Sequence, residues 1–252
     1  MNILLTGATG QLGNAIADFL SNQGFSIRTL GRKQTKIDFD NYSWTLGMYP
    51  DPNAFLNIDY IIHLAWVTNE RGNQSSHLNI GGSAKVFEAA RLAGIKVINI
   101  SSLSAVNPIS IYGATKLSVE KMNSDGINLR IAKVEFLNTS LEFGFFRRII
   151  RSLIFVPIPP EVRVFVAEID DVFVEILTIL SSNFVPKTYS LPNEPYELNN
   201  YLKKYYGLNS FLVPRKLLDV FFMLCKKSHT RLGELVHDRW ISLITTCPAI
   251  EK

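Results

Sequence analysis

The sequence has 252 residues, of which 47% are hydrophobic and 19% charged, so it can bury the core of one domain with a small appendage and is not mainly disordered. No apolar run approaches the ~20 residues of a membrane-spanning helix. The first residues lack the basic start and cleavage site of a signal peptide, so we expect a cytoplasmic protein. The formal net charge is +4, and residues 201–231 hold seven basic residues against one acid. Basic charge confined to one segment argues against nucleic-acid binding, which uses a whole basic face.

In chain order, apolar β-branched runs alternate with amphipathic stretches over the first 180 residues. The runs predict strands at residues 2–6, 25–30, 59–65, 96–100, 128–134 and 162–166, and the amphipathic stretches predict helices at residues 11–22, 76–93, 109–123 and 170–180. Such alternation builds βαβ units. We therefore predict the α/β fold class, with a Rossmann-type doubly wound parallel sheet.

The pattern changes after residue 181, where turns rich in proline and asparagine precede helical segments at 196–206 and 214–227. We divide the chain into a dinucleotide-binding Rossmann domain, residues 1–181, which carries the catalytic residues, and a smaller, mostly helical substrate-binding portion, residues 182–252. Residues 214–227 combine a wide apolar face with basic residues. Packing of this face on the core is the simpler interpretation, and weak peripheral contact with a membrane is the alternative.

A glycine-rich turn directly follows the first predicted strand and reads Thr6-Gly7-Ala8-Thr9-Gly10-Gln11-Leu12-Gly13. Gly7 would permit the tight turn, Gly10 would let a pyrophosphate approach the backbone, and Gly13 would allow close packing of helix and strand. The N-terminus of the helix would face the phosphates. We predict that this turn binds a dinucleotide through Gly7, Thr9, Gly10, Gln11, Leu12 and Gly13.

The end of the second predicted strand indicates which dinucleotide is bound. An acid there would favour NAD, and an arginine would favour NADP. The sequence Gly31-Arg32-Lys33 has no acid, and Arg32, with Lys33 or Arg28 as further candidates, offers a positive charge for the 2′-phosphate. We therefore predict NADP, with NAD as the alternative, and expect Asp38 to cap the adenine pocket.

The sequence Ser101-Ser102-Leu103-Ser104 ends a predicted strand, and the next helix carries Tyr112 and Lys116 four residues apart, on one face. A neighbouring ammonium and the positive nicotinamide ring would favour the phenolate. Tyr112 can then exchange a proton with a substrate hydroxyl or carbonyl whose oxygen a serine holds. The short spacing before Tyr112 leaves Ser102 and Ser104 both open as that serine.

With these motifs, the chain resembles the NAD-dependent epimerase/dehydratase family of extended or atypical short-chain dehydrogenases/reductases, in the branch that modifies nucleotide-activated sugars. The matching elements are the glycine-rich turn, Asp38-Phe39, His63-Leu64-Ala65-Trp66, Asn79-Ile80-Gly81-Gly82-Ser83, Ile100-Ser101-Ser102 and Tyr112-Gly113-Ala114-Thr115-Lys116. The resemblance implies that Ser102 orients the substrate oxygen, Tyr112 is the acid/base and Lys116 holds the nicotinamide ribose. It also implies that Asn79 ties neighbouring strands together and that Phe39, Leu64 and Ala65, together with Tyr112 and Lys116, complete the cofactor site.

One departure from the family narrows the reaction. Leu103-Ser104 stands where the family's 4,6-dehydratases carry an Asp-Glu pair, so elimination of water has no evident acid and base. We therefore expect an NAD(P)-dependent enzyme that reduces the keto group of a nucleotide sugar, and the resemblance implies a role in making a surface polysaccharide such as an O-antigen. The alternatives are a nucleotide-sugar 4-epimerase with tightly bound NAD and a non-catalytic dinucleotide-sensing scaffold. No metal site is predicted, and a homodimer is left open.

Overall fold

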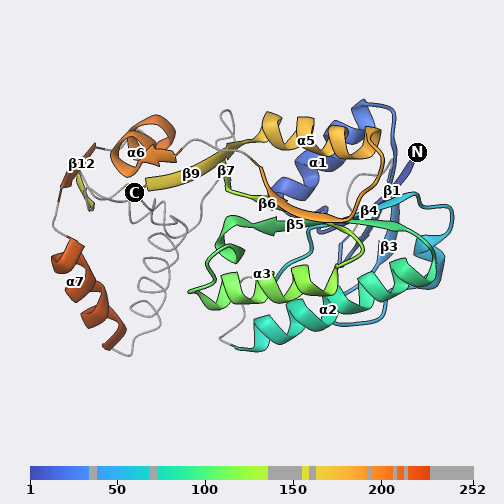
Figure 1. Cartoon of the computed structure of the whole chain (residues 1–252), viewed down its shortest axis with the longest axis horizontal. Helices are drawn as coiled ribbons and strands as arrows, with labels where there is room; N and C mark the ends of the chain where they lie inside the picture. Colours follow the sequence, from blue (N-terminus) through green and yellow to red (C-terminus); the bar gives the residue numbers. More distant parts are fainter. Residues whose placement is uncertain are drawn as a thin grey trace. The chain divides into compact units, whose positions relative to one another are not determined.

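A computed structural model describes residues 1–33, 39–67, 73–135, 155–158, 163–191, 195–206, 209–212 and 215–227 (Figure 1). The chain forms two compact units: the first unit consists of Met1–Ile131 and Asp170–Leu191, and the second of Ala132–Ile169 and Pro192–Lys252. The chain therefore enters the second unit at Ala132, returns to the first at Asp170 and leaves it again at Pro192.

The first unit is built on a parallel sheet of seven strands, as far as the described residues show, in the order β10-β6-β5-β4-β1-β2-β3. The strands are β1 (Asn2–Thr6), β2 (Ser26–Gly31), β3 (Asp40–Ser43), β4 (Tyr60–His63), β5 (Lys96–Ser102), β6 (Ile127–Ile131) and β10 (Lys187–Ser190). The chain moves outward in both directions from the β1/β4 pair. Doubly wound sheets bind ligands at the carboxyl ends of the strands beside such a reversal, and the predicted fold class is confirmed.

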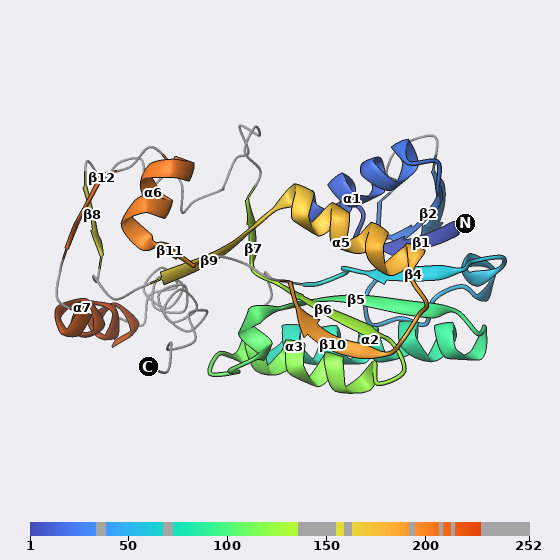
Figure 2. The same ribbon diagram turned by 45° about the horizontal axis from the view of Figure 1, so that its top comes forward.

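Helices cover both faces of this sheet. Helix α1 (Gln11–Asn22) and helix α5 (Ile169–Ser181) lie on one face, and α2 (Asn73–Leu92) and α3 (Ile111–Met122) lie on the other (Figures 1 and 2). Phe19 of α1 stacks on Phe173 of α5 with ring centroids 4.2 Å apart. On the other face, the Thr115 hydroxyl of α3 donates to Ser76 Oγ of α2 at 3.0 Å. These contacts join α1 to α5 on one face of the sheet and α2 to α3 on the other.

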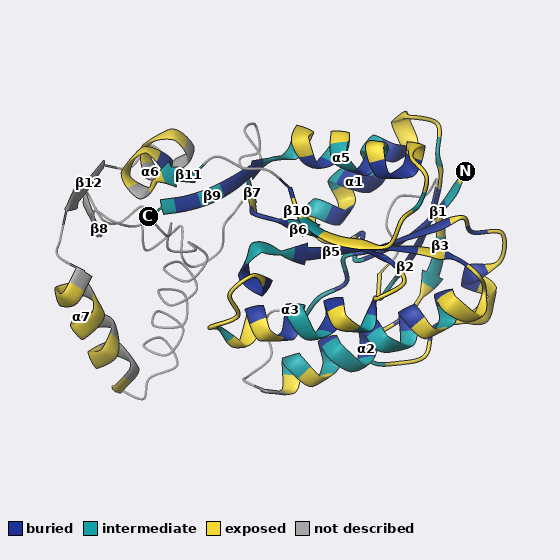
Figure 3. Ribbon diagram, in the orientation of Figure 1, coloured by how far each residue is buried: buried dark blue, intermediate teal, exposed yellow. Residues whose placement is uncertain are grey.

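The central strands are buried on both faces, as a covered parallel sheet requires (Figure 3). Leu4, Ile61 and Ile98 are fully shielded from solvent. Two strands of this sheet that the sequence pattern missed, β3 and β10, lie at its two edges and read Asp-Asn-Tyr-Ser and Lys-Thr-Tyr-Ser. They have no apolar run because edge strands are half-solvated, so hydrophobicity could not reveal them.

The second unit contains short strands and two described helices. Strands β7 (Lys133–Glu135), β9 (Arg163–Glu168) and β11 (Pro195–Glu197) form one sheet, β8 (Phe155–Ile158) pairs with β12 (Asn209–Leu212), and the helices are α6 (Leu198–Tyr206) and α7 (Arg215–Lys227). The strand predicted at 128–134 is divided between β6 and β7 where the chain passes from one unit to the other. The functional division of the chain after residue 181 stays a prediction.

Helix α7 exposes part of its apolar surface. The side chains of Leu217, Val220, Met223 and Leu224 are between 45% and 63% exposed. These four side chains are therefore exposed, and both interpretations of this helix stay predictions. None of the helices in the described ranges is both long and apolar enough to cross a bilayer.

Candidate active site

The glycine-rich turn between β1 and α1 has the close contacts that its sequence predicts. Gly7 adopts a φ of +76°, and a Cβ atom there would lie 2.8 Å from the backbone nitrogen of Ala65. A Cβ atom on Gly13 would lie 2.3 Å from the carbonyl oxygen of Gly7. A larger residue at position 7 would collide with the backbone after β4, and one at position 13 would push α1 away from the turn, so both glycines are required by the packing of this segment.

The N-terminus of α1 is open to a ligand. Gly10 is the N-cap residue and provides no side-chain hydrogen bond, and the first turn of α1 has no acidic residue. Thr9, Gly10 and Gln11 are exposed, while Leu12 is half-buried. Backbone N–H groups at such a helix end suit an anionic phosphate. This turn therefore fits the pyrophosphate of a dinucleotide.

A buried hydrogen-bond network joins the carboxyl ends of β1 and β4. The backbone nitrogens of Leu64 and Ala65 each donate to Thr6 Oγ1 at 3.1 Å, which leaves the Thr6 hydroxyl hydrogen to donate to Nδ1 of His63 at 2.9 Å. His63 Nε2 then donates to Ser83 Oγ at 2.9 Å. Burial, with the positive charge of Lys116, lowers the pKa of His63 to about 3. His63 is thus a neutral structural residue that holds Leu64 and Ala65 beside the turn.

The loop after β4 is held by Asn79 of α2. Asn79 Oδ1 accepts from the backbone nitrogen of Val67 at 2.8 Å, and its Nδ2 donates to the Val67 carbonyl at 3.0 Å. Asn79 was expected to tie strands together, and it instead ties the β4 loop to a helix. Its buried amide fixes the segment that carries Leu64, Ala65 and Trp66.

The two arginines of the β2 region have different surroundings. Arg28 pairs with Asp40 at 2.7 Å and donates to the carbonyls of Ala54 and Leu56 at 3.1 and 2.8 Å, so it is occupied within the fold and is not free for a phosphate. Arg32 is exposed in a bend just after β2. Phe39 is 8% exposed, and Asp38 lies outside the described residues. Of the predicted arginine candidates, Arg32 alone keeps an exposed position.

Tyr112 at the start of α3 is brought to the end of β5. A Cβ atom on Gly113 would lie 2.3 Å from the carbonyl oxygen of Ser104, so the absent side chain lets the helix start press against the strand end. Ser102 Oγ accepts from the backbone nitrogen of Ser104 and donates to Ser104 Oγ, each at 3.3 Å. Ser104 is buried, and Ser102 is the serine whose hydroxyl acts on the pKa of Tyr112.

Two opposing effects act on the Tyr112 phenol. Desolvation raises the pKa of Tyr112, and a hydrogen-bonding interaction with the Ser102 hydroxyl lowers it. Because Tyr112 exposes 40% of its surface, water screens part of the first effect. The phenol is therefore a proton donor at neutral pH that can still be reached from solvent.

Lys116 lies one turn along α3 and is almost fully buried. Its Nζ donates to the Ile100 carbonyl at 3.0 Å and lies 3.9 Å from the centroid of the Trp66 ring and 5.9 Å from that of Tyr112. Burial lowers the pKa of Lys116 to about 7, and Glu120 opposes this shift. The ammonium form is therefore only marginally stable near neutral pH, so small changes around it alter its charge.

Glu120, a further turn along α3, anchors the helix face that carries Tyr112 and Lys116. It accepts two hydrogen bonds from Arg130 Nε at 2.9 and 3.2 Å and one from Nη2 at 2.6 Å, and a fourth from the Ser101 hydroxyl at 2.5 Å. Glu120 is 4% exposed. This buried pair joins α3 to β5 and β6, so Tyr112 and Lys116 are carried on a helix fixed to the sheet.

The sequence reasoning did not assign Trp66, Glu120 or Thr6 to the site. The i, i+4, i+8 spacing of Tyr112, Lys116 and Glu120 could have indicated that Glu120 lies near the other two, because such residues share one helix face. For Trp66 no signal was available, because its contact with Lys116 joins a loop after β4 to a helix about 50 residues later.

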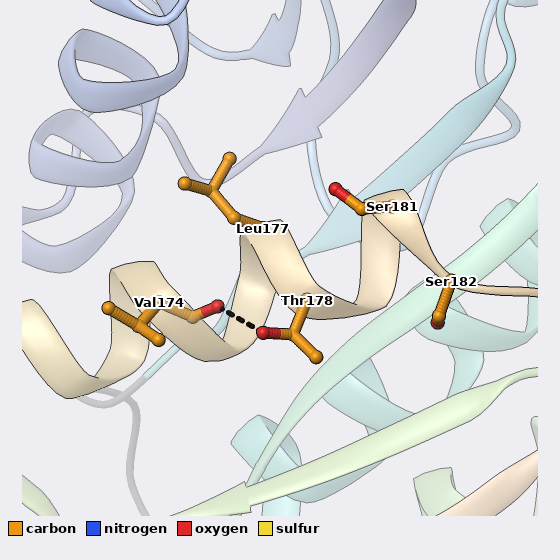
Figure 4. Close-up of a pocket in the computed structure, with 5 residues that line it drawn as sticks. All are labelled: Val174, Leu177, Thr178, Ser181 and Ser182. Atoms are coloured by element: carbon orange, nitrogen blue, oxygen red, sulfur yellow. Dashed lines mark hydrogen bonds between the residues drawn. The ribbon is translucent and has the colours of Figure 1, made fainter.

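A separate hollow on the exposed side of α5 does not have the features of a catalytic site (Figure 4). It is lined by Val174, Leu177, Thr178, Ser181 and Ser182. The Thr178 hydroxyl donates to the Val174 carbonyl of its own helix at 2.8 Å. No charged side chain is among these lining residues.

Comparison with known proteins agrees with this geometry. Residues 3–128 match the model of the NAD dependent epimerase/dehydratase family. The chain belongs to this family. The resemblance drawn from the sequence motifs is thereby confirmed.

Two named relatives each match part of this chain. A UDP-N-acetylglucosamine 4,6-dehydratase (inverting) of Campylobacter jejuni is 28% identical over 140 residues, which cover 48% of this chain and 42% of the relative. A ceramide reductase of Caulobacter vibrioides is 30% identical over 130 residues, which cover 47% of this chain and 40% of the relative. The matched part thus spans less than half of each relative.

Solved structures share the fold more broadly. A short-chain dehydrogenase/reductase superfamily protein from Agrobacterium tumefaciens with bound NAD has a TM-score of 0.69 and 18% identity, covering 85% of both chains. At this identity the likeness establishes the fold alone.

Proposed function

We propose that this protein is an NADP(H)-dependent oxidoreductase that reduces the keto group of a nucleotide sugar, acting in the cytoplasm. The observation that carries the proposal is that Ser102, Tyr112 and Lys116 come together at the end of β5. In the sheet, only β4 separates β5 from β1, the strand that leads into the glycine-rich turn. Family membership supports dinucleotide chemistry on a sugar nucleotide.

The roles of the three residues follow from their chemistry. A bound nicotinamide cofactor would supply the hydride to the keto carbon. The Ser102 hydroxyl donates a hydrogen bond to the keto oxygen and fixes its position. Tyr112 gives its phenolic proton to that oxygen as negative charge develops there, and the Lys116 ammonium stabilises the phenolate that is left.

Dehydration is the family reaction that this site supports least. Leu103 and Ser104 occupy a short 3₁₀ turn, η2 (Leu103–Ala105), and Ser104 is buried. This turn offers no carboxylate to remove or return a proton, unlike the Asp-Glu pair of the dehydratases. Reduction and 4-epimerisation both use Tyr112 and Lys116, and they differ in whether the oxidised cofactor stays bound between steps.

We propose NADP over NAD on the basis of Arg32. Its exposed position after β2 allows a guanidinium to meet a 2′-phosphate, and the sequence from Arg32 to Ile37 contains no acid that would hold a ribose hydroxyl instead. The family description and the NAD-bound structural neighbour support NAD as the alternative.

We also propose that α7 makes weak contact with an anionic membrane surface. Its exposed apolar residues, including Leu217 and Leu224, lie on the same helix as the exposed Lys216 and Lys227. Apolar side chains flanked by lysines are the features with which interfacial helices bind anionic lipid.

The chemical assignment is tested by Tyr112→Phe, which removes only the phenolic oxygen. Turnover of NADPH with a panel of nucleotide 4-keto sugars should fall by roughly 10² to 10⁴, as expected for loss of a positioned acid, while NADPH affinity persists. Tyr49→Phe, at an exposed tyrosine outside the site, is the matched control and should keep full turnover.

Three results would contradict the proposal. Near wild-type turnover in Tyr112→Phe would show that another group supplies the proton. Purified protein that holds oxidised NAD tightly and interconverts sugar epimers would be a 4-epimerase, and protein that binds a dinucleotide without any turnover would be a sensor.

A further inference from the structure

Trp66 occupies an unusual position in relation to the candidate catalytic residues. Its indole face lies 3.9 Å from Lys116 Nζ, and its ring meets that of Tyr112 in a T-shaped contact at 5.8 Å between centroids. Trp66 is half-buried and packs against the core cluster of the first unit. One side chain thus contacts both the proposed proton donor, Tyr112, and the lysine proposed to stabilise its phenolate.

The Lys116 ammonium has few other partners. Its one hydrogen bond within the described residues goes to the Ile100 carbonyl at 3.0 Å. Glu120 is the nearest acid on α3, but its oxygens accept hydrogen bonds from Arg130 and Ser101. No carboxylate of the described chain forms an ion pair with Lys116. The aromatic face of Trp66 is therefore a main source of stabilisation for this buried positive charge.

We propose that Trp66 is a positioning residue, whose indole face holds the charged Lys116 ammonium beside Tyr112. The inference rests on the proposed function for its catalytic meaning, but the contact itself does not depend on any substrate. An indole is the most favourable aromatic face for a cation, and the effect is largest where water is excluded, as it is around Lys116.

The charged and titratable groups around Lys116 determine the expected direction of the effect. Glu120 on the same helix favours the ammonium, His63 on β4 is neutral because its pKa is lowered to about 3, and Tyr112 is protonated at neutral pH. Burial alone disfavours the ammonium. Removing the indole while keeping the site apolar should therefore lower the pKa of Lys116 below its present value of about 7.

The test is a pH titration of Lys116 in the full chain, monitored by NMR of protein labelled with ¹³C at lysine Cε. A Lys116→Met variant assigns the Lys116 signal. We expect Trp66→Leu to lower the pKa of Lys116 by about one unit, which is a tenfold change in its protonation equilibrium. Trp66→Phe, which keeps a weaker aromatic face, should restore about half of the shift. Trp44→Phe, at a buried tryptophan of the same cluster without a contact to Lys116, should leave it unchanged.

Each result decides the proposal. An unchanged or raised pKa of Lys116 in Trp66→Leu, or equal shifts in Trp66→Leu and Trp66→Phe, would show that the indole only fills space or excludes water. Amide spectra report whether each variant is folded. Because the titration needs no substrate, it would still test the contact between Trp66 and Lys116 if the proposed reaction were wrong. If the reaction is as proposed, the high-pH limb of kcat moves to lower pH in Trp66→Leu by the same amount.

Discussion

Arg28 and Arg32 stand four residues apart, yet the fold gives them different roles. Arg28 lies within β2, where its guanidinium binds Asp40 and the carbonyl oxygens that end a short 3₁₀ turn, η1 (Pro52–Phe55). Arg32 lies beyond the end of the same strand and is exposed. Position relative to the strand end thus separates a structural arginine from one that can meet a ligand.

Arg32→Ala tests the proposed cofactor preference. A charge-assisted contact between guanidinium and phosphate is worth on the order of 1.5 to 3 kcal/mol, so NADPH affinity should fall tenfold or more while NADH affinity stays nearly constant. Fluorescence titration of both cofactors provides the measurement. Arg28→Ala is the matched control, and it should lower stability without changing the ratio of the two affinities. Equal losses of NADPH and NADH in Arg32→Ala would assign Arg32 a structural role.

At the scale of elements, α3 is held at its start by close packing and at its end by polar contacts with the sheet. Gly113 lets its start approach Ser104, and Glu120 binds Arg130 of β6. Beyond its last turn, Asn123 Nδ2 donates to Asn128 Oδ1 of β6 at 3.2 Å. Breaking a buried pair such as Glu120–Arg130 leaves an uncompensated charge, so the pair restricts the helix to one position. The spacing of Tyr112 from Ser102 depends on these anchors.

Helix α7 carries a prediction of its own. The protein should co-sediment with vesicles containing anionic lipid at low salt and be released at high salt, because each basic residue near such a surface contributes roughly 1 kcal/mol that salt screens. The double variant Lys216→Gln/Lys227→Gln should weaken binding more than tenfold, and Leu217→Ser should weaken it at every salt concentration. Vesicles of neutral lipid are the control. Equal binding to neutral and anionic vesicles, or none at all, would contradict the charge-based contact.

At the scale of the whole molecule, the two compact units share the chain in alternation. The first unit is completed only when the chain returns with α5 and β10, after the strands β7, β8 and β9 of the second unit. Each unit is therefore built from segments distant in sequence. Neither unit is therefore one continuous piece of the chain, and the contacts within each unit close long loops.

The buried His63 makes the stability of the first unit sensitive to acid. The pKa of His63 is about 3 in the fold and near 6.5 when unfolded, so below pH 6.5 the unfolded state binds a proton that the folded state does not. The free energy of unfolding should therefore fall by about 2 kcal/mol from this residue between pH 7 and pH 5, and continue to fall toward pH 3. Urea unfolding at each pH measures this loss.

Two variants isolate the His63 contribution from that of other titrating groups. His63→Gln should show a smaller loss between pH 7 and pH 5, whatever its stability at pH 7. His77→Gln, at an exposed histidine of α2, should retain the wild-type loss. The same acid dependence in all three proteins would mean that His63 is not held neutral by the fold.

The sequence by itself determined the fold class, the family and the order of the motifs. Buried parallel strands must be apolar on both faces, and helices that cover them must be amphipathic, so the βαβ pattern and the bounds of α1 could be predicted directly. The glycines of the first turn were readable because no other residue fits where Gly7 and Gly13 approach backbone atoms. These features depend on local geometry, which neighbouring residues encode.

Only the tertiary structure decided which residues meet. It lets the Ser102 hydroxyl lower the pKa of Tyr112, pairs Arg28 with Asp40, and brings Trp66 over Lys116. It also adds β3 and β10 at the edges of the sheet and interleaves the two units. Such contacts join residues that are far apart in the chain, and their energies depend on burial and on the partners that burial leaves available. Local sequence patterns contain neither of these quantities.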